Sequence, residues 1–178
     1  EMLRSLVGSE MCIRDRLLAA NVIGHDPSNW VQVITIDKGR RDGVRIASPV
    51  LEKNGVVGQV ISLGNRSARV LLLSDRTSGV DALVQGSRAR GILEGRGRFA
   101  CRLNYVSVDE EVKIGDRVIT SGLDKVFPKG LLLGVVSSLD NKNSGELFRE
   151  IEVRASVDFV KLETVAVLLS TPKRPLLD

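Results

Sequence analysis

Short apolar stretches separated by glycines run through nearly the whole chain, and they constrain its fold more than any other feature. Apolar and polar residues alternate over 99–105 and again over 150–157. A period of two with one polar face indicates an antiparallel strand that packs on one side. The chain holds 17 glycines and five prolines, as expected for many tight turns. The sequence therefore predicts an all-β protein of roughly a dozen short strands, arranged as barrels or a sandwich.

Composition indicates what the core is made of. Hydrophobic residues make up 43% of the 178 residues but aromatic residues only 3%, so the core must consist of valine, leucine and isoleucine. These side chains suit the pleated, half-buried surface of a sheet. The length is sufficient for one domain or two small ones.

A weak internal repeat divides the chain. In residues 43–60 and again in 115–136, a turn and a strand lead to a second strand whose glycines are three or four residues apart, Gly55 and Gly58 in one copy and Gly130 and Gly134 in the other. Glycine inside a strand marks a bend or a close backbone approach, and small barrels need such bends to close. We expect a first β-barrel over residues 21–85 and a second over 86–170. Whether C-terminal strands complete the first barrel is left open.

The two ends of the chain differ from the rest. Residues 5–16 resemble the translation of a sequencing-library adapter, so residues 1–20 are interpreted as a non-native segment. The alternative is the remnant of a coiled coil, because Leu17, Leu18 and Ala20 could close a helix. Residues 171–178 contain two prolines and mixed charges, and we expect a disordered tail.

Several motifs in fixed order resemble one family. They read ITIDKG at 34–39, GVVGQV at 55–60, TSGL at 120–123, FPKGL at 127–131 and GVV at 134–136. Each motif alone is weak, but their order and spacing from Asn21 to Leu169 are similar to the rod shape-determining protein MreC family. The resemblance implies an all-β fold of two small antiparallel six-stranded β-barrels packed together.

The resemblance also implies a function. Proteins of this family are non-enzymatic scaffolds of the bacterial cell-elongation machinery, which maintain rod shape by binding and positioning peptidoglycan synthases. The implied partners are a class B penicillin-binding transpeptidase, the membrane protein MreD, other elongation-complex proteins and further copies of the chain. The implied location is the extracytoplasmic, periplasmic side of the inner membrane. The family carries a membrane helix and a coiled coil before its β region, and we expect both to be missing here, so that membrane contact would depend on that missing helix.

Residues suited to catalysis or metal binding are scarce. His25 is the one histidine, and the two cysteines, Cys12 and Cys101, are far apart in the sequence, which is too few ligands for a zinc site. No phosphate-binding glycine motif is found. We therefore predict no enzyme activity and no cofactor. A two-barrel serine protease is the enzymatic alternative, with His25 and Ser121 as its candidates, although a triad needs a histidine and an acid converging on the serine.

Basic residues suggest a second alternative. The net charge is +4, and five arginines with a single acid, Glu94, lie between residues 88 and 102. A basic β-barrel that binds nucleic acid or the ribosome would explain them. Nucleic-acid platforms also use exposed aromatic residues for stacking, and this chain has one Trp, one Tyr and four Phe. Binding of nucleic acid is therefore not expected.

Candidate site residues fall into two groups. An all-β protein can bind partners through an unpaired strand edge or an apolar patch. For such a patch we choose Phe99, Tyr105, Val126 and Phe127. Turns and bulges that the fold requires are assigned to glycines: Gly39, Gly43, Gly55, Gly58, Gly91, Gly115, Gly122, Gly130 and Gly134.

Overall fold

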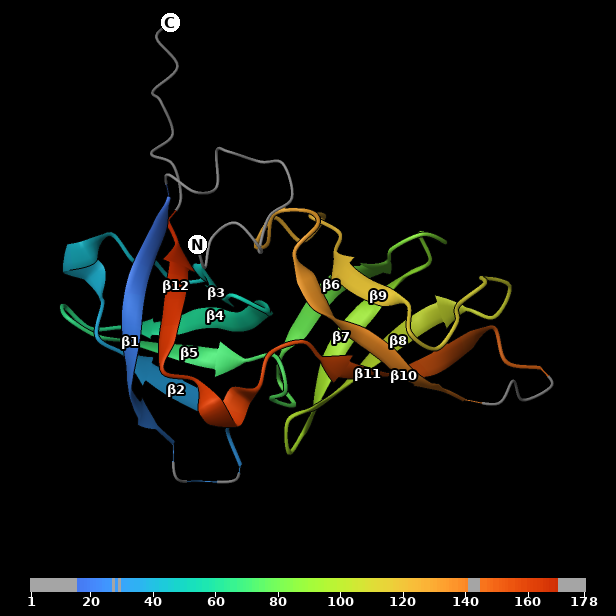
Figure 1. The fold of residues 1–178 in the computed structure, drawn as a ribbon, viewed down its shortest axis with the longest axis horizontal. Helices are drawn as coiled ribbons and strands as arrows, with labels where there is room; N and C mark the ends of the chain where they lie inside the picture. Colours follow the sequence, from blue (N-terminus) through green and yellow to red (C-terminus); the bar gives the residue numbers. More distant parts are fainter. Residues whose placement is uncertain (1–15, 27, 29, 141–144, 170–178) are drawn as a thin grey trace, which may run out of the picture.

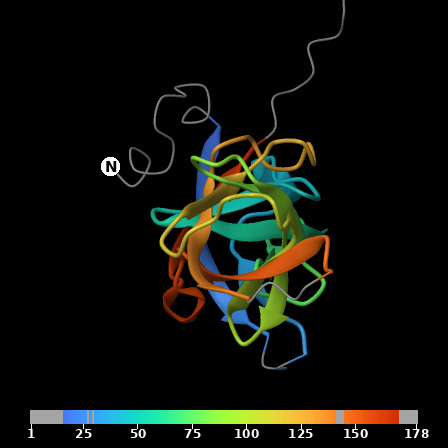
Figure 2. The same cartoon turned by 90° about the vertical axis from the view of Figure 1, so that its right-hand side faces the viewer.

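The computed structural model describes residues 16–26, 28, 30–140 and 145–169. Within these residues the chain forms two closed six-stranded antiparallel β-barrels that lie side by side along the long axis of the molecule (Figure 1). Viewed along that axis, the second barrel lies in front of the first (Figure 2). The predicted all-β fold of two barrels is confirmed.

The first barrel has the strand order β1-β12-β3-β4-β5-β2. Its strands are β1 (Leu17–His25), β2 (Val33–Ile36), β3 (Pro49–Glu52), β4 (Gly55–Leu63), β5 (Ala68–Leu72) and β12 (Thr164–Leu168). A 3-10 turn, η1 (Arg40–Asp42), follows β2.

The second barrel has the order β10-β11-β8-β7-β6-β9. Its strands are β6 (Gly79–Val84), β7 (Arg90–Gly97), β8 (Ala100–Ser107), β9 (Arg117–Thr120), β10 (Leu132–Leu139) and β11 (Phe148–Ala155). A second 3-10 turn, η2 (Phe159–Lys161), precedes β12.

The closing strands of the two barrels are exchanged. If β7 to β11 are matched in sequence order with β1 to β5, the two barrels have the same cyclic strand order. In this comparison, β12 of the first barrel occupies the position of β6 in the second. The strand that follows β1–β5 in sequence thus closes the second barrel, and the strand that follows β7–β11 closes the first. The chain crosses between the barrels at residues 73–78 and again at 156–163.

This exchange moves the expected boundaries. The second barrel begins at β6 rather than at residue 86, because β6 pairs with β7 and β9. The first barrel is completed by β12, which pairs with β1 and β3. Residues 17–20 are part of strand β1, where Leu17 pairs with Leu168, and therefore do not close a helix. Residues 1–15 and the tail at 171–178 lie outside the described residues.

The barrel interiors are aliphatic, as the composition predicts. Ile34, Ile36 and Val50 are fully buried in the first barrel. Along β11 burial alternates: Ile151 and Val153 are inside, and Glu150 and Glu152 are outside. This confirms the period-two interpretation of the strand.

Glycines allow neighbouring strands to approach closely at matching positions of the two repeats. A Cβ at Gly58 would overlap the carbonyl oxygen of Leu71, and one at Gly134 would overlap that of Arg154. Other predicted positions share one of these roles: Gly39 and Gly91 lie against backbone oxygens, whereas Gly43, Gly55, Gly115, Gly122 and Gly130 have positive φ. The prediction omitted Gly95, whose Cβ would overlap the carbonyl oxygen of Asp75 in the first crossing.

Both crossings are held by the β7–β8 hairpin of the second barrel. The N–H of Gly97 donates to the carbonyl oxygen of Ser74 at 2.9 Å, in the first crossing. The ring of Phe99 stacks on that of Phe159, in the second crossing, with centroids 6.0 Å apart. Because Phe159 is buried, this contact anchors the connection between the barrels.

Candidate interaction surfaces

The residues suited to catalysis do not come together. His25 ends β1 in the first barrel, whereas Ser121 follows β9 in the second. The hydroxyl of Ser121 donates to the Asp81 carboxylate at 2.7 Å. Within the described ranges no group of three or more His, Cys, Asp or Glu side chains could hold a metal ion. The same residues contain no helix long and apolar enough to span a membrane.

An exposed apolar surface lies on the second barrel, where β8 and β11 pair. It consists of Tyr105 and Phe148, and we call it the Tyr105–Phe148 face. The two residues are 58% and 54% exposed, respectively. The two rings meet edge to face, with centroids 6.3 Å apart. Aromatic side chains exposed together in this way are typical of protein-binding surfaces.

A β-bulge produces this face. Between the pairs Arg149–Val106 and Ile151–Leu103, strand β8 has two residues, Asn104 and Tyr105, where β11 has one. At the bulge Tyr105 has a φ of +64°. A bulky residue with left-handed backbone is a conformational outlier, and it persists only where the surrounding structure enforces it. The bulge turns the tyrosine ring out of the barrel wall and toward Phe148.

Polar groups surround the two rings. A cavity of about 770 Å³ is lined by Tyr105, Phe148 and the polar residues Asn104, Asp140, Glu146, Arg149 and Glu150. The Asn104 amide donates to Glu94 at 2.6 Å, which fixes one wall. The buried Arg149 guanidinium donates to the main-chain oxygen of Glu110. An apolar centre with a polar rim is the usual anatomy of a protein interface.

The four residues chosen for an apolar patch do not form a single patch. They line three different cavities, with Tyr105 in one, Phe99 in another, and Val126 and Phe127 in a third. Phe127 is only 3% exposed and belongs to the core, so its ring is not available to a partner. Its burial follows from the Asp124 carboxylate, which accepts the N–H groups of Val126 and Phe127 and folds this loop back on the barrel.

Phe148 was missed by the sequence reasoning, although the sequence contains a signal for it. In the alternating strand β11, Phe148 shares the phase of Glu150 and Glu152, which is the outward phase. An aromatic residue in the polar phase of a strand predicts an exposed ring.

Two of the five arginines in the arginine-rich segment lie beside carboxylates. Arg90 lies 3.4 Å from the Asp81 carboxylate. Arg102 pairs with Glu150 and lies 3.9 Å from Glu152. The carboxylates beside Arg90 and Arg102 weaken the attraction of these two side chains for phosphate groups.

Two closed barrels with exchanged closing strands and an exposed aromatic face define a paired-barrel β domain. The chain belongs to the family described as "Rod shape-determining protein MreC, barrel core", which matches residues 22–169. This family consists of non-enzymatic cell-shape proteins, and membership therefore argues against the protease alternative.

Known proteins support this membership. The cell shape-determining protein MreC of Listeria monocytogenes is 35% identical over 156 residues, which are 85% of this chain and 52% of that protein. The crystal structure of MreC from Pseudomonas aeruginosa is 33% identical, with a TM-score of 0.83, over 87% of this chain and all of that chain. The chain spans about half the length of the curated relatives it matches.

Two further structures bear on location and fold. The major periplasmic domain of a cell shape-determining filament MreC is 25% identical, with a TM-score of 0.76, over 87% of this chain and 96% of that one. The described barrels are therefore the periplasmic domain of an MreC-family protein. MreC in a complex with the penicillin-binding protein PBP2 of Helicobacter pylori shares the fold at 14% identity and a TM-score of 0.65, over 86% of this chain and 99% of that one.

Proposed function

We propose that this chain is a scaffold domain of the cell-elongation machinery that binds and positions a class B penicillin-binding transpeptidase through the Tyr105–Phe148 face. The observation that carries the proposal is the bulge at Tyr105, which holds an aromatic ring outside the barrel in a strained conformation. The Helicobacter pylori MreC structure, which is a complex with PBP2, supports a partner of this class.

The chemistry of the face fits a docking role. Aromatic residues dominate binding energy when they fill desolvated pockets on a partner. The edge-to-face contact with Phe148 fixes the Tyr105 ring before a partner arrives. Because the ring is already ordered, binding loses less side-chain entropy. We expect apolar side chains of the transpeptidase to cover both rings, with Glu146 and Glu150 at the rim.

The wider role follows from the same scaffold function. The chain would bring the transpeptidase together with MreD and other elongation proteins, and would self-associate. The relative described as a filament supports self-association. In this proposal the chain breaks no bond itself and acts by positioning the synthase.

Site-specific photocross-linking tests the proposed face. A photoreactive benzoylphenylalanine at Phe148 should cross-link to the extracytoplasmic domain of the class B transpeptidase from the same organism. The matched control places the same residue at Ile114, which is 67% exposed on the same barrel. Adducts at 148 but not at 114 are expected. Equal adducts at both positions, or none at 148 from a folded chain, would show that another surface binds the transpeptidase.

A further inference from the structure

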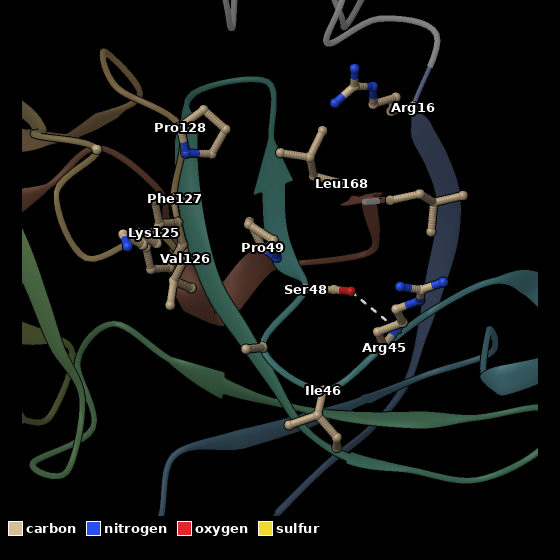
Figure 3. A pocket seen from close by; sticks show the side chains of 13 residues that line it. Arg16, Arg45, Ile46, Ser48, Pro49, Lys125, Val126, Phe127, Pro128 and Leu168 are labelled. Atoms are coloured by element: carbon tan, nitrogen blue, oxygen red, sulfur yellow. Dashed lines mark hydrogen bonds between the residues drawn. The ribbon is translucent and has the colours of Figure 1, made fainter. Parts of the chain in front are cut away.

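A cleft separates the two barrels on the side where Arg16 and Leu169 lie, and the function proposed above does not use it. The cavity measures about 530 Å³. The first barrel contributes the loop at 45–49, and the second contributes the loop at 122–128. Figure 3 shows Arg16 and Arg45 on one side of the opening and Lys125 on the other, with Ser48 and Pro49 between them. A cleft of this size matches a short peptide segment or a small ligand.

Three cations border this inter-barrel cleft. Arg45 and Lys125 are exposed and Arg16 is half-buried. None of the three forms an ion pair with a carboxylate of the described residues. Cations gathered around a concave surface focus a positive potential on it. The charge of this cleft is therefore complementary to an anionic ligand.

Apolar side chains supply the rest of the lining. Ile46 is 58% exposed at one edge, and Val126 and Pro128 line the opposite edge. Leu168 and Leu169 close the end beside Arg16. A ligand that fills this cleft therefore needs apolar groups interspersed with negative charge.

The two edges of the cleft have fixed backbone conformations. Ala47 and Lys125 have φ values of +66° and +59°, so each edge contains a non-glycine residue with left-handed backbone. The Ala47 N–H donates to the carbonyl oxygen of Val60 at 2.8 Å, and the Arg45 N–H donates to the Ser48 hydroxyl at 3.1 Å. Strained residues that hydrogen bonds hold in place are common at ligand-binding edges. The cleft is therefore preformed.

We propose that the inter-barrel cleft binds an extended acidic segment of a partner protein. In this arrangement carboxylates of the segment pair with Arg45 and Lys125 on opposite edges, and apolar side chains between them pack on Ile46 and Val126. A single extended chain reaches both edges of a narrow cleft, whereas a flat anionic membrane would contact only its rim. The site is distinct from the Tyr105–Phe148 face and does not depend on it.

Fluorescence anisotropy of the full chain tests the proposal. The probe is a short fluorescein-labelled peptide of alternating leucine and aspartate, compared with the same peptide carrying lysine in place of aspartate. Arg45→Glu/Lys125→Glu should weaken binding of the acidic peptide on the order of tenfold or more. The matched control is Arg66→Glu/Arg117→Glu, which replaces one exposed arginine on each barrel and changes the net charge by the same amount. This control should bind the acidic peptide as tightly as the unaltered chain does.

The outcomes separate the possible ligands. Binding of the acidic peptide alone, lost in the cleft variant and kept in the control, supports the proposal. Equal weakening in both variants overturns it, because net charge and not the cleft would then cause binding. No binding of either peptide also overturns it, as does binding to phosphatidylglycerol vesicles alone. If circular dichroism shows that the double variant is unfolded, Arg45→Gln/Lys125→Gln replaces it.

Discussion

The main-chain N–H of Gln32 donates a 2.7 Å hydrogen bond to the carboxylate of Asp75, and this contact ties the first barrel to the first crossing. The other carboxylate oxygen accepts the N–H of Thr77 at 2.8 Å and its hydroxyl at 2.6 Å. Burial by itself raises the pKa of Asp75, but the hydrogen bonds from Thr77 and Gln32 outweigh it and hold the pKa below its ordinary value of 3.8. The ionised carboxylate therefore stabilises the junction of the barrels.

Asp75→Asn should lower the free energy of unfolding by about 1–3 kcal/mol at pH 7, because an amide places an N–H group against one of the donors. A lowered pKa gives stability that is present above pH 3.8 and is lost as the pH falls below it. The difference between the two proteins in urea unfolding should therefore shrink in acid. Asp109→Asn, at an exposed position, is the control. A difference that stays constant below pH 3.8 would contradict the role of the charge.

Gly55 in the first barrel touches the second, because a Cβ at this residue would lie 2.5 Å from the carbonyl oxygen of Leu132. Gly55→Ala should cost about 2 kcal/mol or more of unfolding free energy. Gly86→Ala is a matched control, because Gly86 also has a positive φ, of +102°, but has nothing within 4 Å of the added carbon. The excess cost at Gly55 measures the close approach. Equal costs in thermal or urea unfolding would show that the barrels separate at this point.

Cys101 lies inside the second barrel, where burial raises the pKa of its thiol to about 12. In a Cys12→Ser chain at pH 8, iodoacetamide should alkylate the folded protein about a thousandfold more slowly than the urea-unfolded protein, since the thiolate is the nucleophile. The raised pKa also means that this group's contribution to stability is lost as the pH rises from 9 toward 12. Similar alkylation rates in the two states would show that the barrel opens readily.

The strain at Tyr105 predicts that glycine is more stable than alanine at this position, which is the reverse of the usual order. At an ordinary strand position glycine is less stable than alanine by about 0.5–1 kcal/mol. At Tyr105 the φ of +64° should make Tyr105→Gly more stable than Tyr105→Ala by about 1 kcal/mol, because glycine removes the left-handed strain. Arg102→Gly and Arg102→Ala on the same strand provide the comparison and should show the usual order. The same order at both positions would mean that the bulge is unstrained.

Local patterns predicted the strands but not their partners. The alternation in 150–157 correctly separates the buried Ile151 and Val153 from the exposed glutamates. The exchange of β6 and β12 leaves no such trace, because both strands are short and largely apolar and occupy the same place in the cyclic order. Which barrel a strand closes depends on the two crossings, where tertiary contacts such as Gln32–Asp75 and Phe99–Phe159 decide.

The interaction surface was predicted only in part for a similar reason. In the sequence pattern Tyr105 shares the phase of the buried residues of β8. It nevertheless lies on an exposed face, because the bulge reverses the direction of its side chain. Phe127 was chosen for an exposed patch but is buried, because Asp124 folds the loop inward. A bulge and a side-chain cap depend on residues outside the strand pattern, and alternation alone therefore cannot predict either.

Isothermal titration calorimetry of this chain against the extracytoplasmic domain of the class B transpeptidase from the same organism tests the scaffold function most directly. We expect saturable binding with a negative heat-capacity change, which reports burial of apolar surface. Tyr105→Gly/Phe148→Ser should remove the binding while the chain stays folded. A folded chain that does not bind the transpeptidase, or a double variant that binds as tightly as the unaltered chain, would contradict the proposed scaffold function at this face.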